Sequence, residues 1–219
     1  VRGQTEARRA LEIALAGGHG LLLTGPPGVG KTLLLRTIPG LLPPLDDAAA
    51  LAATIVASAA GEGPLRDLRR TAPFRTPHHT SSYAAMVGGG PDLMPGEITR
   101  ADHGVLFLDE LAEFDRDVLE ALRQPLEEGR VTIARARRVV TFPARFQLVA
   151  AMNPCPCGFA GTEPEGRCTC SPRLVERYQR RVSGPLRDRL DLWIHMPLGH
   201  GRPPRRSRRA GRIRRGRPT

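Results

Sequence analysis

The stretch GLLLTGPPGVGKTLLL, residues 20–35, decides the fold of this chain. Its apolar start, residues 20–24, predicts a short buried strand, and a helix is predicted to begin near Lys31. The loop between them fits the pattern G-x-x-x-x-G-K-[ST], whose backbone N–H groups wrap phosphates at a helix N-terminus. An ordinary glycine turn is the alternative, but it leaves the lysine, the threonine and the flanking strand and helix unexplained.

This loop is therefore expected to bind ATP together with Mg²⁺. Lys31, the sole lysine of the chain, would neutralise the β- and γ-phosphates. The hydroxyl of Thr32 would ligate Mg²⁺. The predicted nucleotide-binding residues are Gly25, Pro26, Pro27, Gly28, Val29, Gly30, Lys31 and Thr32.

A second apolar run, residues 105–108, ends in two acids, Asp109 and Glu110. At the carboxyl end of a strand, Asp109 would hold Mg²⁺ directly or through water, and Glu110 would polarise the attacking water. The alternative is an acidic helix cap on a solvated edge. The phosphate loop makes the functional interpretation the stronger of the two.

Two further polar residues follow predicted strands or helices. Asn153 ends the apolar run 146–151 and could orient the water or contact the γ-phosphate, although it could equally be a turn residue. Residues 183–192 predict a short helix that runs into a strand, and an arginine here could reach a neighbouring subunit's ATP. Its alternative is a surface salt bridge with Asp188 or Asp191.

The remaining pattern indicates an α/β fold with a parallel sheet and right-handed crossovers. Helices are predicted at 6–16, 46–60 and 115–127, the last capped by Asp115. Strands 130–135 and 138–142 are predicted to form a hairpin turning near residues 136–137. Residues 71–96, rich in Pro, Gly, His and Ser, are predicted to be loops with short elements at most.

The net charge of +11 lies mostly in residues 199–219, which hold nine arginines and no acid. The rest of the chain is nearly neutral, so overall basicity is weak evidence for nucleic-acid binding.

The sequence contains no apolar run of about 18 residues, so no membrane span is predicted. No secretory signal is visible, so we expect a cytoplasmic, reducing location. Val1 is not a start methionine, so residues upstream are expected to be missing.

All four cysteines lie close together, as Cys155, Cys157, Cys168 and Cys170. In a reducing compartment, clustered cysteines are more often metal ligands than disulfides, and four thiolates suit a structural Zn²⁺. Free thiols and a redox disulfide remain the alternatives.

Five segments in order resemble the Mg-chelatase-like AAA+ ATPases, and among them the bacterial ComM (YifB) group. They are GGHGLLLTGPPGVGKT (17–32), FRTPHHTSSYAAMVGGG (74–90), GVLFLDELAEFDRDVLEALRQPLEEGRVTIARA (104–136), FPARFQLVAAMNPCPCG (142–158) and SGPLRDRLDL (183–192). The resemblance, over about residues 2–197, implies an AAA+ P-loop NTPase core that assembles into rings, commonly hexamers. It also implies a Walker A loop at 25–32, Walker B acids at Asp109 and Glu110, sensor 1 at Asn153 and an arginine finger at Arg189.

The resemblance further implies two inserts that face the ring pore, a helix-2 insert at 71–96 and a hairpin before sensor 1 at 130–142. Arg135, Arg137 and Arg138 at the hairpin tip would then contact DNA phosphates, the alternative being a solvated basic hairpin. His78 and His79 are expected to point in opposite directions, so they are not predicted to form a metal pair.

Members of the ComM group are similar to helicases that drive DNA branch migration, whereas chelatase subunits use ATP to help insert Mg²⁺ into a porphyrin. The cysteine-bearing stretch 153–158 favours the ComM group. An inactive remnant that only binds nucleotide is the third hypothesis. We expect no membrane partner.

The chain departs from the family at both ends. By comparison with the family, we expect a Lon-like N-terminal domain and a C-terminal helical lid to be missing from this piece, which would then turn ATP over poorly. We divide it into an AAA+ core at 1–198, with a cysteine-rich loop at 153–171, and a basic, disordered tail at 199–219. The loss of pattern after Pro197 suggests an out-of-frame tail, the alternative being a genuine nucleic-acid-binding tail. Residues 2–4 are expected to cover part of the adenine base.

Overall fold

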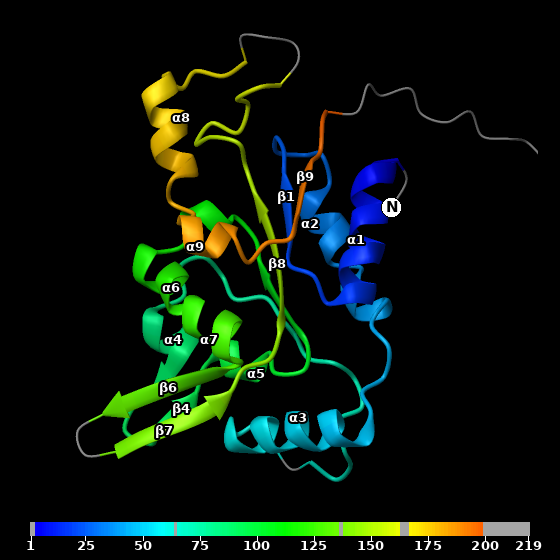
Figure 1. Cartoon of the computed structure of the whole chain (residues 1–219), viewed down its shortest axis with the longest axis vertical. Coiled ribbons are helices and arrows are strands. Elements are labelled where there is room, and N and C mark those ends of the chain that lie inside the picture. Colours follow the sequence, from blue (N-terminus) through cyan, green and yellow to red (C-terminus); the bar gives the residue numbers. More distant parts are fainter. Residues whose placement is uncertain (1–2, 64, 136–137, 163–166, 199–219) are drawn as a thin grey trace, which may run out of the picture.

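The computed structural model describes residues 3–63, 65–135, 138–162 and 167–198, and its centre is a five-stranded sheet (Figure 1). All neighbouring strands are parallel, in the order β2-β5-β8-β1-β9. Their bounds are β1 Leu21–Thr24, β2 Phe74–Arg75, β5 Val105–Leu108, β8 Gln147–Met152 and β9 Leu192–His195. The three central strands are almost continuously apolar because helices cover both faces of a parallel sheet.

Side chains of the strands alternate between two buried clusters, one on each face of the sheet. Leu21 and Leu23 pack with α1 (Thr5–Gly17) and α2 (Lys31–Leu35). Leu22 packs on the opposite face, in a cluster that includes side chains of α4, α5, α6, α8 and α9. Those helices span Tyr83–Val87, Glu97–Arg100, Arg116–Ala121, Pro172–Gln179 and Gly184–Arg187. The sheet is therefore the middle of three layers. Packing on both of its faces holds the ends of its strands in fixed positions.

The remaining elements lie around these layers. Helix α3 (Asp47–Ala59) is capped by the Asp46 side chain, which accepts from the Ala49 N–H. Helix α7 spans Arg123–Glu128, and short 3₁₀ turns span Ile38–Gly40 and Leu111–Glu113. Two antiparallel hairpins complete the fold, β3 (Gly88–Gly89) with β4 (Met94–Pro95) and β6 (Arg130–Arg135) with β7 (Arg138–Pro143).

The predicted helix 115–127 is wrong in one respect, since it is two helices that meet at Leu122. Pro125 has no N–H to donate to the carbonyl four residues earlier, and its ring crowds that carbonyl, so the helix breaks there. Asp115 occupies the capping position, but its side chain makes no capping hydrogen bond. Helix α8 was not predicted, although Ser171 caps it and Pro172 begins it, a pair that marks helix starts.

The predicted insert 71–96 begins too early. Residues Phe74 and Arg75 form β2, which pairs with β5 at the edge of the main sheet. The part that projects from the sheet begins after β2 and includes the β3–β4 hairpin. That hairpin lies beside β6–β7, because a Cβ on Gly88 would sit 3.0 Å from Cδ1 of Ile133 (Figure 1).

The β6–β7 hairpin has the predicted register, with Arg135 opposite Arg138. Arg137, Arg2 and the tail 199–219 lie outside the described residues. Within the described part of the chain, no helix has both the length and the apolar character needed to cross a bilayer.

Candidate active site

The sheet order explains why the predicted site residues meet. Strands β5, β8 and β1 are neighbours, and each is followed at its carboxyl end by a candidate segment. Asp109 follows β5, Asn153 follows β8, and the phosphate loop follows β1. They line a cleft of about 440 Å³ together with Glu110 and Thr32, a volume in the range of ligand sites.

Lys31 lies deep in this cleft, with only 8% of its surface exposed. Its Nζ donates hydrogen bonds to the carbonyls of Gly25 at 2.6 Å and Pro26 at 2.9 Å, and to Oδ1 of Asn153 at 3.1 Å. Burial lowers the pKa of Lys31, against the opposing effect of the Asp109 and Glu110 charges. The ammonium is therefore held at the point where the loop backbone and Asn153 converge.

Thr32 and Asp109 form the second contact of the cleft. The Thr32 hydroxyl donates to Oδ2 of Asp109 over 2.7 Å. A hydroxyl and a carboxylate side by side are hard oxygen ligands of the kind that Mg²⁺ takes alongside phosphate oxygens. These two residues therefore fit a Mg²⁺ site.

Glu110 is held by a residue that the sequence analysis did not select. Its backbone is left-handed, with φ 55°, and its Oε2 lies 3.0 Å from Nδ1 of His79. The His79 ring also meets Phe114 edge to face at 6.5 Å. His79 thus connects the loop after β2 to the carboxylate that is predicted to act on water.

The expectation that His78 and His79 point in opposite directions is wrong. Their ring centroids lie 4.2 Å apart, because the chain turns here and the His78 ring hydrogen-bonds Thr80. The rule of alternating directions holds only for extended chain. A Pro-His-His-Thr sequence that turns could have signalled this arrangement.

Arg189 lies outside the cleft. Its Nη2 is 3.1 Å from Oε1 of Glu127, and both side chains are about half exposed. Arg189 thus forms a surface salt bridge, as the alternative predicted, but its partner is Glu127 and not Asp188 or Asp191. Asp191 instead accepts a hydrogen bond from the Gly20 N–H at 2.7 Å, at the start of β1.

The four cysteines come together as predicted. Their sulfurs all lie within 4.8 Å of one another. Three of the Sγ–Sγ separations are 3.3, 3.8 and 3.6 Å. Tetrahedral Zn²⁺ with Zn–S near 2.3 Å would place the sulfurs about 3.8 Å apart. A disulfide needs about 2.05 Å, so all four are free thiols that fit a metal.

The electrostatics of the cluster also suit a cation. Backbone N–H groups of Phe159 and Thr169 lower the pKa of Cys157 to about 6. The Cys170 N–H lowers the pKa of Cys168, but desolvation and the neighbouring sulfurs outweigh it and raise that pKa to about 11. One thiol of the cluster therefore loses its proton readily, and the loss of a second proton is unfavourable. A bound cation would favour the loss of further protons.

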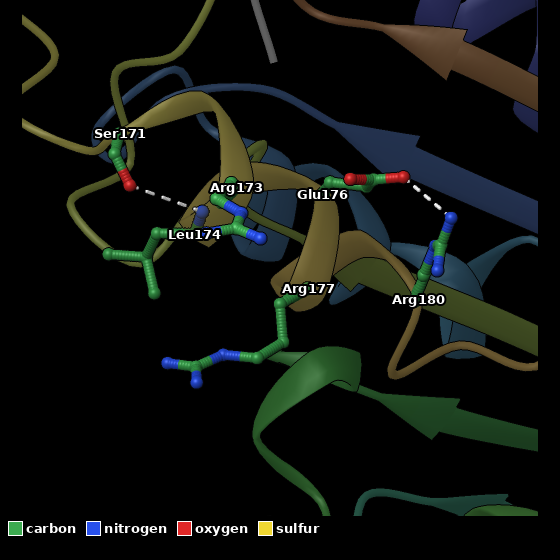
Figure 2. A pocket seen from close by; sticks show the side chains of 6 residues that line it. All are labelled: Ser171, Arg173, Leu174, Glu176, Arg177 and Arg180. Atoms are coloured by element: carbon green, nitrogen blue, oxygen red, sulfur yellow. Dashed lines mark hydrogen bonds and ion pairs between the residues drawn. The ribbon is translucent and has the colours of Figure 1, made fainter.

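A larger cleft of about 580 Å³ lies along α8, away from these residues. Figure 2 shows Arg173 and Arg177 extending from this helix, while Glu176 pairs with Arg180 at 2.6 Å and Ser171 caps the helix. None of the predicted catalytic residues lines it, so it is not part of the nucleotide site.

Comparison with known proteins agrees with this arrangement. Residues 1–202 match the family "Magnesium chelatase, subunit ChlI". Competence protein ComM of Haemophilus influenzae is 52% identical over 197 residues, covering 90% of this chain and 38% of that protein. Uncharacterized protein YifB of Escherichia coli is 51% identical over 199 residues, with the same two coverages.

A solved structure confirms the fold. The crystal structure of NtrX from Brucella abortus in complex with ADP has a TM-score of 0.52 and 17% identity, covering 90% of this chain and 37% of that one. The chain thus spans under two fifths of the length of each of these relatives.

Proposed function

This chain belongs to the magnesium chelatase subunit ChlI family and has the AAA+ fold, and from that premise we propose that it is an ATP-hydrolysing motor subunit that remodels DNA. The observation that carries the ATPase proposal is the convergence of Lys31, Thr32, Asp109, Glu110 and Asn153 on one cleft at the carboxyl ends of three neighbouring strands.

The proposed roles follow from chemistry and position. Lys31 and the loop backbone bind the phosphates, and Thr32 and Asp109 hold Mg²⁺, which when bound neutralises charge on the β- and γ-phosphates. Glu110, oriented by His79, polarises the attacking water, and Asn153 contacts the γ-phosphate. Arg189, half exposed and outside its own cleft, completes the site of a neighbouring copy in a ring, which we expect to be a hexamer.

DNA as the substrate rests on the similarity to ComM, whose name places it in competence, and on the basic hairpin. Arg138 is exposed at the start of β7, and Arg135 ends β6. Together with Arg137 they would contact phosphates of DNA in the pore, and ATP-driven movement of the hairpin would displace the duplex during branch migration. Four thiols at tetrahedral spacing support a structural Zn²⁺ beside this motor.

The test is ATP hydrolysis by this chain and by a version extended to the length of its relatives, with and without branched DNA. We expect DNA to stimulate the extended protein and Glu110→Gln to abolish hydrolysis while nucleotide still binds. If DNA does not change the rate of ATP hydrolysis, chelatase-type activity on a porphyrin-binding partner is favoured. Absence of hydrolysis in both proteins would identify a remnant that only binds nucleotide.

A further inference from the structure

The cysteine loop, residues 154–170, lies directly against the nucleotide site. Cys155 is fully buried and follows Asn153 by two residues. The loop then turns back, so that a Cβ placed on Gly158 would lie 2.7 Å from Cδ of Pro27 and 3.9 Å from Cγ of Asn153. The loop therefore packs closely against Pro27 of the phosphate loop and lies beside Asn153, the predicted sensor.

Among the described residues of this loop, few hydrogen bonds reach the rest of the protein. Its described residues form neither helix nor strand. Most of the hydrogen bonds found among them are local, such as the Gly158 N–H to the Cys155 carbonyl and the Ala160 N–H to the Cys155 sulfur. One bond from outside, Gln179 Nε2 to the Pro154 carbonyl at 3.1 Å, reaches its first residue. A loop without strand pairing and with mainly local hydrogen bonds is the kind of segment that a cross-link orders.

We propose that a soft divalent cation bound by Cys155, Cys157, Cys168 and Cys170 controls nucleotide affinity, by fixing the surface on which Pro27 and Asn153 rest. This inference rests on the proposed metal site and extends it to the ATP site. Four thiolates leave no open coordination position, so the metal itself takes no part in hydrolysis. Its effect passes through Gly158 to the phosphate loop, and through the chain from Cys155 back to Asn153 and its bond with Lys31.

Two glycines of the loop provide a matched pair of variants. Gly158 and Gly161 both have left-handed backbones, with φ 87° and 68°. Alanine is therefore strained at both positions, and more so at Gly158, whose φ lies beyond the left-handed region that L residues adopt. Only at Gly158 would the added methyl press on Pro27, because no heavy atom lies within 4 Å at Gly161. Neither residue is a metal ligand, so both variants should keep their metal.

The experiment measures zinc content by mass spectrometry and affinity for a fluorescent, non-hydrolysable ATP analogue with Mg²⁺, on reduced protein. We expect about one zinc ion per chain in the wild type and in both glycine variants. Overpacking of about 1.4 kcal/mol at Gly158 should weaken analogue binding about tenfold, with Gly161→Ala unchanged. Removing zinc by chelation, or by Cys168→Ser, should weaken binding similarly, with circular dichroism checking that the sheet stays folded.

The outcomes separate this inference from the proposals beneath it. If the wild-type protein contains no zinc, both the proposed metal site and its coupling to nucleotide affinity are wrong. Zinc that can be removed without changing analogue affinity overturns the coupling alone. Equal affinities for the Gly158 and Gly161 variants overturn the route through Pro27. Failure of the wild type to bind the analogue at all overturns the ATPase proposal, and the coupling with it.

Discussion

Replacing Arg189 by alanine tests whether this residue acts on a neighbouring copy. Among the described residues, Arg189 has one ion-pair partner, Glu127, at 3.1 Å, and both side chains are 45% exposed. Pairs this exposed contribute only about 0.2–1 kcal/mol. Arg189 can therefore leave Glu127 and bind a phosphate group at little cost in free energy. Arg189→Ala should therefore leave stability almost unchanged and lower hydrolysis about 10³-fold or more, the contribution typical of an arginine finger.

Two control variants make this measurement specific. Glu127→Gln releases Arg189 from its ion pair. Because that pair contributes at most about 1 kcal/mol, the rate of hydrolysis should rise by no more than about fivefold. Arg187→Ala removes an arginine two residues away, whose guanidinium lies 4.8 Å from the centroid of the Trp193 ring. Its loss should cost about 0.5–1 kcal/mol of stability and little activity.

The assay is steady-state phosphate release at increasing protein concentration, on each variant and on mixtures. Arg189→Ala mixed with Lys31→Ala should regain activity, because some interfaces then combine an intact phosphate loop with an intact arginine from the next copy. Full activity of Arg189→Ala alone, or no recovery in the mixture, would refute action on a neighbour.

Three further predictions concern single residues. Burial raises the pKa of Glu97, but the hydrogen bond and charge of Arg75 lower it overall. The free energy of unfolding should therefore fall as pH drops below about 4.3, and Glu97→Gln should flatten that fall in urea titrations. Gly104→Ala would press a methyl onto a neighbouring backbone carbonyl, so thermal unfolding should show a loss of about 2 kcal/mol. His79→Ala removes the contact with Glu110, and kcat should fall about tenfold with KM unchanged.

The sequence predicted the parts of the fold that depend on local pattern. Strands 105–108 and 146–151 were evident because a buried parallel strand is apolar throughout, and the strand–loop–helix context identified the phosphate loop. The break at Leu122 was missed because the helical pattern continues through it. Only the backbone consequence of Pro125 interrupts the helix.

Contacts between distant segments could not be derived from one sequence. His79 and Glu110 are 31 positions apart, and their contact depends on how the loop after β2 folds over the end of β5. The partner of Arg189 is neither of the acids next to it in the sequence but Glu127, which the packing of α7 brings close. The cysteine cluster was predictable because its members are close in sequence and share one chemistry.

The solitary lysine offers a built-in reporter. Lys31 is the one lysine of the chain, it is nearly buried, and burial lowers the pKa of its amine. Apart from the α-amino group, acylation can occur at no other amine, so the mass shift on a single peptide reads out phosphate-loop occupancy on the native chain without any label. Protection by ATP, followed over time, would then give nucleotide exchange rates for every variant described above that keeps Lys31, from one mass spectrum per time point.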